Sequence, residues 1–212
     1  MWCSTPWPKP EGPSRNRRQM LRAAGMGACA AVAAKAAAWA VPAWANPAAP
    51  APAGKQPLTH LGPTLWPRGE GGLRFLGLPI YTARLWVAEG FEPTDYAQHP
   101  LALELTYSRA FSARQIAERS FQEMERQTTV KQADKANFIE KMIAIFPDVK
   151  PGHRLLGLHS PTQGARFWSG SQPGAAALGA VDDPTFSKLF FGIWLSSATS
   201  EPNLRQALLA AG

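Results

Sequence analysis

From Leu73 onward, stretches with the apolar spacing of strands and stretches with the apolar spacing of helices follow one another. Their order restricts the fold more than any other feature of the chain. Leu73–Val87 is rich in leucine, β-branched and aromatic residues, a composition typical of strands. Gly77 and Pro79 within this stretch predict a turn or a bulge. Leu101–Ser108 then alternates apolar and polar residues, which predicts a strand with one buried face.

Helical spacing follows these strands. Ser112 is a favourable N-cap for a first helix, and the apolar residues of Phe138–Phe146 recur at the spacing of a second helix that Pro147 ends. The pair Asp183-Pro184 predicts the start of a third helix. Pro202–Leu209 predicts a short last one.

A second pair of strands is expected between these helices. Residues His153–His159 and Ala165–Trp168 flank the turn-forming segment Ser160–Gly164 and predict a hairpin. Strands, helices, strands and helices in this order predict an α+β fold with an antiparallel sheet.

Residues 1–45 resemble a twin-arginine export signal. Arg17-Arg18 is followed by Gln19-Met20-Leu21-Arg22 and an Ala-rich stretch, and Ala43-Trp44-Ala45 fits a cleavage site. The alternatives are a basic tail beside an Ala-rich helix, or a retained anchor. Because alanine barely favours lipid, the stretch is a poor membrane span. We expect an exported, periplasmic protein that has a Pro/Ala-rich linker at 46–57 and one domain at 58–212.

The charge of the chain lies mostly in this leader. The whole sequence has 22 basic and 15 acidic residues, of which six bases and one acid precede residue 46, so the remainder has a net charge of +2. A balance this small indicates no nucleic-acid partner. Both cysteines, Cys3 and Cys29, also lie in the leader. The domain therefore has neither thiolate metal ligands nor a cysteine nucleophile.

Familiar catalytic and cofactor motifs are missing from the sequence. It has no phosphate-binding loop, no G-x-S-x-G, no H-E-x-x-H and no dinucleotide fingerprint, so we expect no cofactor. Gly69–Gly72 is interpreted as a turn. His153 and His159 are expected about 20 Å apart on one strand, too far to share a metal, so we expect no metal site. Charged residues at i,i+4 spacing on the first helix indicate a solvated face: Glu118, Arg119, Glu123 and Arg126.

Tyr81–Trp86 is the segment with the most unusual polar pattern. On a strand, Thr82 and Arg84 share one face, and Tyr81 shares the other face with Ala83. A Thr and an Arg that point into an apolar layer need partners, because unpaired buried charge is costly. The partner is an anionic ligand group, a glutamate, or solvent at an open sheet face.

Four stretches of the chain resemble the bacterial chalcone isomerase-like family in sequence and order, and the similarity covers most of residues 70–209. The resemblance implies an open-faced β-sandwich, in which helices pack on one side of a large antiparallel sheet and leave a cleft. The stretches are Leu73–Val87 (LRFLGLPIYTARLWV), Leu101–Tyr107 (LALELTY), Phe146–Val149 (FPDV) and Phe190–Leu195 (FFGIWL).

The resemblance also implies candidate site residues. Plant members of the superfamily close a flavanone ring, whereas relatives without this activity bind fatty acids in the same cleft. Thr82 falls where the plant enzymes keep a threonine near the reacting carbonyl, and Arg74 or Arg68 is the candidate for their arginine. Their tyrosine, lysine and asparagine on the first helix correspond to Ile116, Arg119 and Glu123, so the tyrosine is absent, and Tyr107 does not obviously replace it.

We therefore expect a non-catalytic protein that binds a small apolar or fatty-acid-like ligand with an anionic head group. The candidate ligand-binding residues are Arg74, Thr82, Arg84 and Arg119. One alternative is an isomerase (an intramolecular lyase) that acts on an enone, with Thr82 as the tentative catalytic residue. A second alternative is an interaction module whose cleft is filled by its own side chains.

Overall fold

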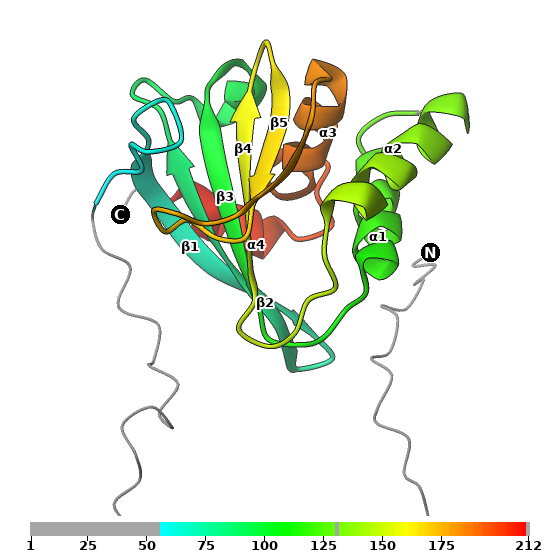
Figure 1. Cartoon of the computed structure of the whole chain (residues 1–212). Helices are drawn as coiled ribbons and strands as arrows, with labels where there is room; N and C mark the ends of the chain where they lie inside the picture. Colours follow the sequence, from blue (N-terminus) through cyan, green and yellow to red (C-terminus); the bar gives the residue numbers. More distant parts are fainter. Residues whose placement is uncertain (1–55, 130–131, 211–212) are drawn as a thin grey trace, which may run out of the picture. The chain divides into compact units, whose positions relative to one another are not determined.

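The computed structural model describes residues 56–129 and 132–210 of the chain. The expected signal at 1–45, and the expected linker up to residue 55, lie outside the described residues. The described part forms one antiparallel sheet whose six strands are hydrogen-bonded in sequence order (Figure 1). The strands are β1 (Trp66–Phe75), β2 (Leu78–Val87), β3 (Leu101–Tyr107), β4 (Arg154–Ser160), β5 (Gly164–Trp168) and β6 (Ala177–Val181).

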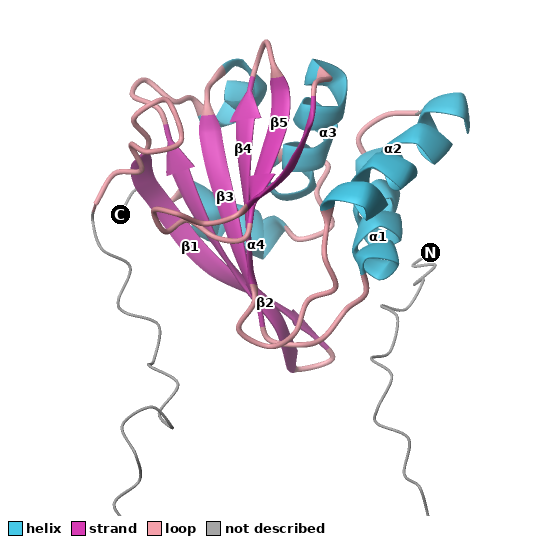
Figure 2. Ribbon diagram, in the orientation of Figure 1, coloured by secondary structure: helices cyan, strands magenta, loops and turns pink. Residues whose placement is uncertain are grey.

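Helices gather on one side of this sheet, and the expected α+β open-faced architecture is confirmed (Figure 2). α3 packs on β4 and β5, α4 packs on β1, and α1 and α2 pack against each other. The helices are α1 (Ala113–Glu125), α2 (Gln132–Ile145), α3 (Pro184–Leu195) and α4 (Pro202–Leu209), and a 3₁₀ segment, η2, covers Pro93–Gln98.

The predicted helix starts are confirmed in their hydrogen bonding. The Ser112 hydroxyl accepts from the Gln115 backbone N–H, and the Gln115 side chain accepts from the Ser112 N–H, which is a capping box. The Asp183 carboxylate accepts from the N–H groups of Thr185 and Phe186, with Pro184 in the first turn. These caps fix where α1 and α3 begin, and so which of their side chains face the sheet.

The two faces of the sheet differ in what covers them. Alternate residues of each strand face the helices, and Ala83, Leu85 and Leu103 on that face are buried in the main core. The opposite face has a smaller apolar cluster, which includes Leu58 and Trp86. We call the helix-covered side the inner face and the other side the outer face.

Gly69–Gly72 is part of β1 rather than a turn, so that prediction was wrong. β1 lies against α4, and the glycines allow the two backbones to approach closely. A Cβ atom on Gly69 would lie 2.4 Å from the carbonyl oxygens of Ala207 and Leu208, and one on Gly71 would lie 2.7 Å from Leu204 Cδ1. Glycine is required here by the approach of the helix.

Candidate functional site

A small apolar cavity lies between the inner face of the sheet and helices α1 and α3. Its volume is about 80 Å³. Most of its walls come from leucines of β3 and β4 and from aromatic residues of β5 and α3, including Leu103, Leu105, Leu155, Phe167, Phe190 and Phe191. Drug-sized ligands occupy pockets of roughly 300–1,000 Å³, so the cavity as it stands holds only a much smaller molecule.

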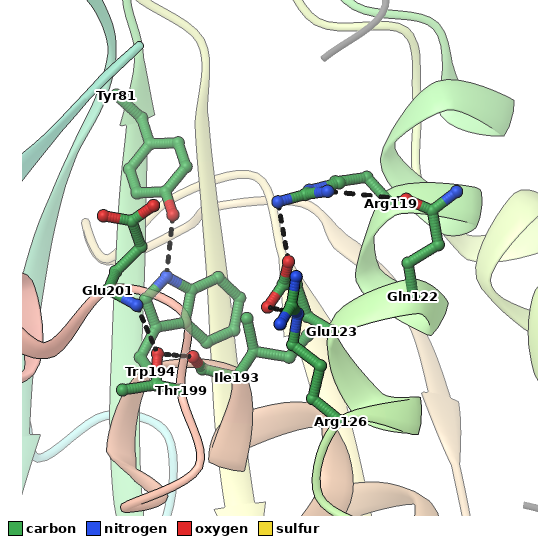
Figure 3. Close-up of polar contacts among 9 residues, drawn as sticks. All are labelled: Tyr81, Arg119, Gln122, Glu123, Arg126, Ile193, Trp194, Thr199 and Glu201. Carbon is green, nitrogen blue, oxygen red and sulfur yellow. Dashed lines mark hydrogen bonds and ion pairs between the residues drawn. The ribbon is translucent and has the colours of Figure 1, made fainter. Parts of the chain in front are cut away.

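One end of the cavity is polar and charged (Figure 3). Glu123 on α1 is only 5% exposed. Its Oε1 lies 2.6 Å from Arg119 Nη2, and its Oε2 lies 3.2 Å from Arg126 Nε. Two guanidinium groups thus compensate the buried carboxylate, which would otherwise be costly in this apolar setting.

Two aromatic side chains line this end from the opposite wall. Trp194 Nε1 on α3 donates a 3.0 Å hydrogen bond to the hydroxyl oxygen of Tyr81 on β2. Burial raises the pKa of Tyr81, and burial likewise raises the pKa of Tyr107, which also lines the cavity. Both phenols are therefore neutral and act as O–H donors at physiological pH.

Glu201 is the second carboxylate that lines the cavity. Its backbone N–H donates to Thr199 Oγ1, and the Thr199 hydroxyl donates to the Ile193 carbonyl (Figure 3). Burial raises the pKa of the Glu201 carboxyl, and the negative charge of Glu123 raises it further. The end of the cavity thus holds two carboxylates, one of which protonates more readily than an ordinary glutamate.

Arg119 is the one residue among the four predicted ligand-binding residues that lines this cavity. Thr82 is exposed on the outer face of the sheet, because its neighbour Tyr81 faces inward. Thr82, the tentative catalytic residue, therefore lies outside the cavity.

Arg84 and Arg74 also lie away from the cavity. The Arg84 guanidinium pairs with the Glu70 carboxylate at 2.9 Å on the outer face. Of the three partners considered for Arg84, the structure therefore has the glutamate, on the open face of the sheet. Arg74 is exposed beside the β1–β2 turn and donates to the Gly77 carbonyl. The other candidate for the plant arginine, Arg68, donates to the carbonyl of Leu209 in α4.

Sequence reasoning identified only part of the polar end: the family resemblance placed Arg119 and Glu123 at site positions, whereas Trp194 and Glu201 were not candidates. The interpretation of Glu123 as part of a solvated helix face was wrong, because α1 turns this residue toward the cavity. Tyr107, which was not a candidate, lines the cavity together with Ile116. The alternation of Tyr81, Ala83 and Leu85 with polar residues was the signal that Tyr81 faces inward. Nothing in the local sequence marked Glu201.

The histidines are separate from this site. His159 is buried on β4, with its Nδ1 2.6 Å from Ser187 Oγ and its Nε2 3.1 Å from the carbonyl of Ala97, whereas His153 precedes that strand. Burial lowers the pKa of His159. No group of three or more potential metal-ligating side chains occurs within the described ranges 56–129 and 132–210. Similarly, no helix in these ranges is long and apolar enough to cross a membrane.

Comparison with known proteins assigns the family. A family profile described as chalcone isomerase-like matches residues 69–210, which covers the sheet except the first three residues of β1, and all four α-helices. The chain belongs to the chalcone isomerase-like family. No curated protein matches the sequence of this family member.

A solved structure shares the fold of this chalcone isomerase-like protein. It is a fatty-acid binding protein of Arabidopsis thaliana, and the match covers 68% of this chain and 86% of the plant chain with a TM-score of 0.53. The two sequences are 8% identical, so the likeness concerns the arrangement of sheet and helices and assigns no individual side chain.

Proposed function

We propose that this chalcone isomerase-like protein is a non-catalytic binding protein for a small apolar molecule with a polar end, of the fatty-acid type. The observation that carries the proposal is the composition of the cavity. Most of its walls are leucine and aromatic side chains, and its only cluster of charged lining residues, among those described, is Arg119, Glu123 and Glu201. Such a lining favours an apolar body in one orientation.

The polar end supplies complementary groups for an acid or a hydroxyl. The Arg119 guanidinium can bind a carboxylate while Arg126 stays paired with Glu123, and Tyr81 and Tyr107 are neutral donors. Burial raises the pKa of the Glu201 carboxyl, so this group takes up a proton beside an anionic head group more readily than an ordinary glutamate. The plant protein with a similar fold is a fatty-acid binding protein, which supports this ligand class.

Binding of a long chain requires the cavity to widen. Helix α1 packs mainly against α2 and α3 rather than against a strand, so it is the wall that moves at least cost to the sheet. If this wall does not move, the domain corresponds to the alternative in which its own side chains fill the cleft. No observation favours the ring-closing alternative, since Thr82 lies outside the cavity.

We also propose that the protein acts outside the cytoplasm. The support is the sequence of residues 1–45, with its paired Arg17 and Arg18 and its Ala43-Trp44-Ala45 site. Export of the full chain in a bacterial host, compared with an R17K/R18K variant, tests this. Normal export of the double variant would exclude the twin-arginine route.

Native mass spectrometry of the full chain with added oleate tests the ligand proposal. We expect one bound oleate, and its loss in Arg119→Gln. Arg84→Gln is the matched control, because it removes the same charge on the outer face and should leave binding unchanged. Absence of oleate from the wild-type chain, or equal loss in both variants, would contradict binding at Arg119.

A further inference from the structure

The turn between β1 and β2 places a leucine, Leu76, in a backbone conformation that disfavours leucine. Leu76 and Gly77 both have positive φ angles, of 49° and 78°, and Phe75 pairs with Leu78 across them. This is the pattern of a two-residue type I′ hairpin, which strongly favours Asn-Gly or Asp-Gly. Leucine in the left-handed region is strained, so the choice of leucine here does not serve the turn itself.

The strained residue also displays its side chain to solvent. Leu76 is 86% exposed, and its neighbours Phe75 and Leu78 are 38% and 51% exposed. They are three of the four large apolar side chains that are exposed in the part of the chain that the structure describes; the fourth, Trp66, begins β1. A strained backbone that presents apolar side chains to water is a mark of a functional surface.

Basic residues lie at the same end of the molecule as this apolar tip. The β3–α1 and α2–β4 connections lie at the same end of the molecule as the turn (Figure 1), and the Ser108 N–H donates to the Ile80 carbonyl. These connections and the turn carry Arg74, Arg109 and Lys150, against one acid, Asp148, whose carboxylate accepts from the Ala113 N–H. The net charge at this end is therefore positive.

We propose that the β1–β2 turn docks on the surface of an anionic lipid bilayer. Phe75, Leu76 and Leu78 enter the interfacial region, and Arg74, Arg109 and Lys150 lie near the lipid phosphates. A projecting two-residue turn is far smaller than the roughly 1,000 Å² that a specific protein interface needs, and its combination of apolar tip and basic rim fits a bilayer surface.

Docking at this turn goes beyond ligand binding and does not depend on it. Leu73, which lines the cavity, lies two residues before Phe75 on β1. The docked turn would hold that edge of the cavity near the bilayer. Failure of oleate binding would leave the docking proposal intact, and failure of docking would leave the cavity proposal intact.

Flotation of the full chain with vesicles of phosphatidylglycerol and phosphatidylcholine tests the proposal. Leu76→Asn should weaken partitioning at least about tenfold, the lower value expected for loss of one buried leucine. Arg74→Gln and Lys150→Gln should each weaken it about fivefold, and vesicles of phosphatidylcholine alone should bind poorly. All variants keep residues 1–45, so the contribution of those bases is common to them.

Trp66→Ser is the matched control. It removes an exposed aromatic side chain from the other end of β1, about 30 Å from the turn, and should leave partitioning unchanged. Equal partitioning of wild type and Leu76→Asn would overturn the proposal, as would equal loss in Trp66→Ser. Concentration-dependent dimerisation that Leu76→Asn abolishes, without vesicle binding, would assign the turn to a second copy of the chain instead.

A thermal melt separates docking from a structural role of Leu76. Asparagine suits a positive φ, so Leu76→Asn should raise the melting temperature by about 2 °C while it weakens membrane binding. A lowered melting temperature would show that the leucine stabilises the fold, and would overturn the argument from strain.

Discussion

Trp194 on α3 donates its indole N–H to the hydroxyl oxygen of Tyr81 on β2, at 3.0 Å. Both side chains are buried, and they lie 113 residues apart in the sequence. The bond is therefore a direct polar link between the sheet and the helix layer, and it forms part of the cavity wall. Its loss leaves a buried donor without an acceptor.

Tyr81→Phe should lower the free energy of unfolding by about 1–3 kcal/mol, because the Trp194 N–H stays buried and unsatisfied. Urea denaturation measures this. Thr82→Val, one position along β2 but on the exposed outer face, should change stability by less than about 0.5 kcal/mol. Equal effects of the two substitutions would show that the hydrogen bond contributes little.

Gly69→Ala should destabilise the protein severely, by about 3 kcal/mol or more. The added Cβ would lie 2.4 Å from two carbonyl oxygens of α4, and neither backbone can yield without moving the helix. Gly72→Ala in the same strand is the matched control, since the nearest atom to its Cβ would be 3.7 Å away. Thermal melts of both variants test this, and a stable Gly69→Ala would contradict the close approach of β1 and α4.

The fold follows from the sequence wherever a local pattern determines it. The Ser112 capping box, the Asp183-Pro184 start of α3 and the β4–β5 hairpin all depend on residues within a few positions of one another. Gly69–Gly72 was misassigned because its glycines are required by α4, which lies more than 130 residues later in the sequence. A glycine that makes room for a distant helix has the same local sequence as a glycine in a turn.

The candidate site was less predictable because it combines distant residues. The alternation of Tyr81–Trp86 was assigned correctly, but the pattern left open whether Thr82 and Arg84 meet a ligand, a glutamate or solvent. In the structure Tyr81 and Ala83 face the helices, whereas Thr82 and Arg84 face outward. A shift of the pattern by one residue would move every inward-facing side chain of the strand to the outer face and every outward-facing one to the inner face. Glu201 joins the site only because α4 folds back beside β1, which no local pattern indicates.

Arg119→Gln should destabilise the protein by about 1–3 kcal/mol, since Glu123 keeps only one of its two guanidinium partners in a buried setting. Arg114→Gln on the same helix breaks an exposed pair with Glu118 and should cost less than about 1 kcal/mol. The double variant R119Q/E123Q should recover much of the loss, because it removes the buried charge. A double variant no more stable than Arg119→Gln would contradict this electrostatic account. Urea denaturation of the four proteins forms the required comparison.

Glu201→Gln should change how stability depends on pH. The pKa of Glu201 is raised above its ordinary value of 4.5, first by burial and then by the charge of Glu123, so the folded protein holds this proton more tightly than the unfolded chain. The contribution of Glu201 to the free energy of unfolding is fully present below pH 4.5, and it is lost as the pH rises through the raised pKa. Glutamine does not ionise, so Glu201→Gln removes this loss of stability.

The variant should therefore match the wild type in acid and exceed it at pH 7, by less than about 1 kcal/mol because the carboxyl is partly solvated. Urea denaturation of both proteins across pH 4–8 measures this difference. The titration of His159 is common to both proteins and does not contribute to it. A difference between Glu201→Gln and wild type that is constant with pH would mean that the carboxyl is as well solvated in the folded protein as in the unfolded chain.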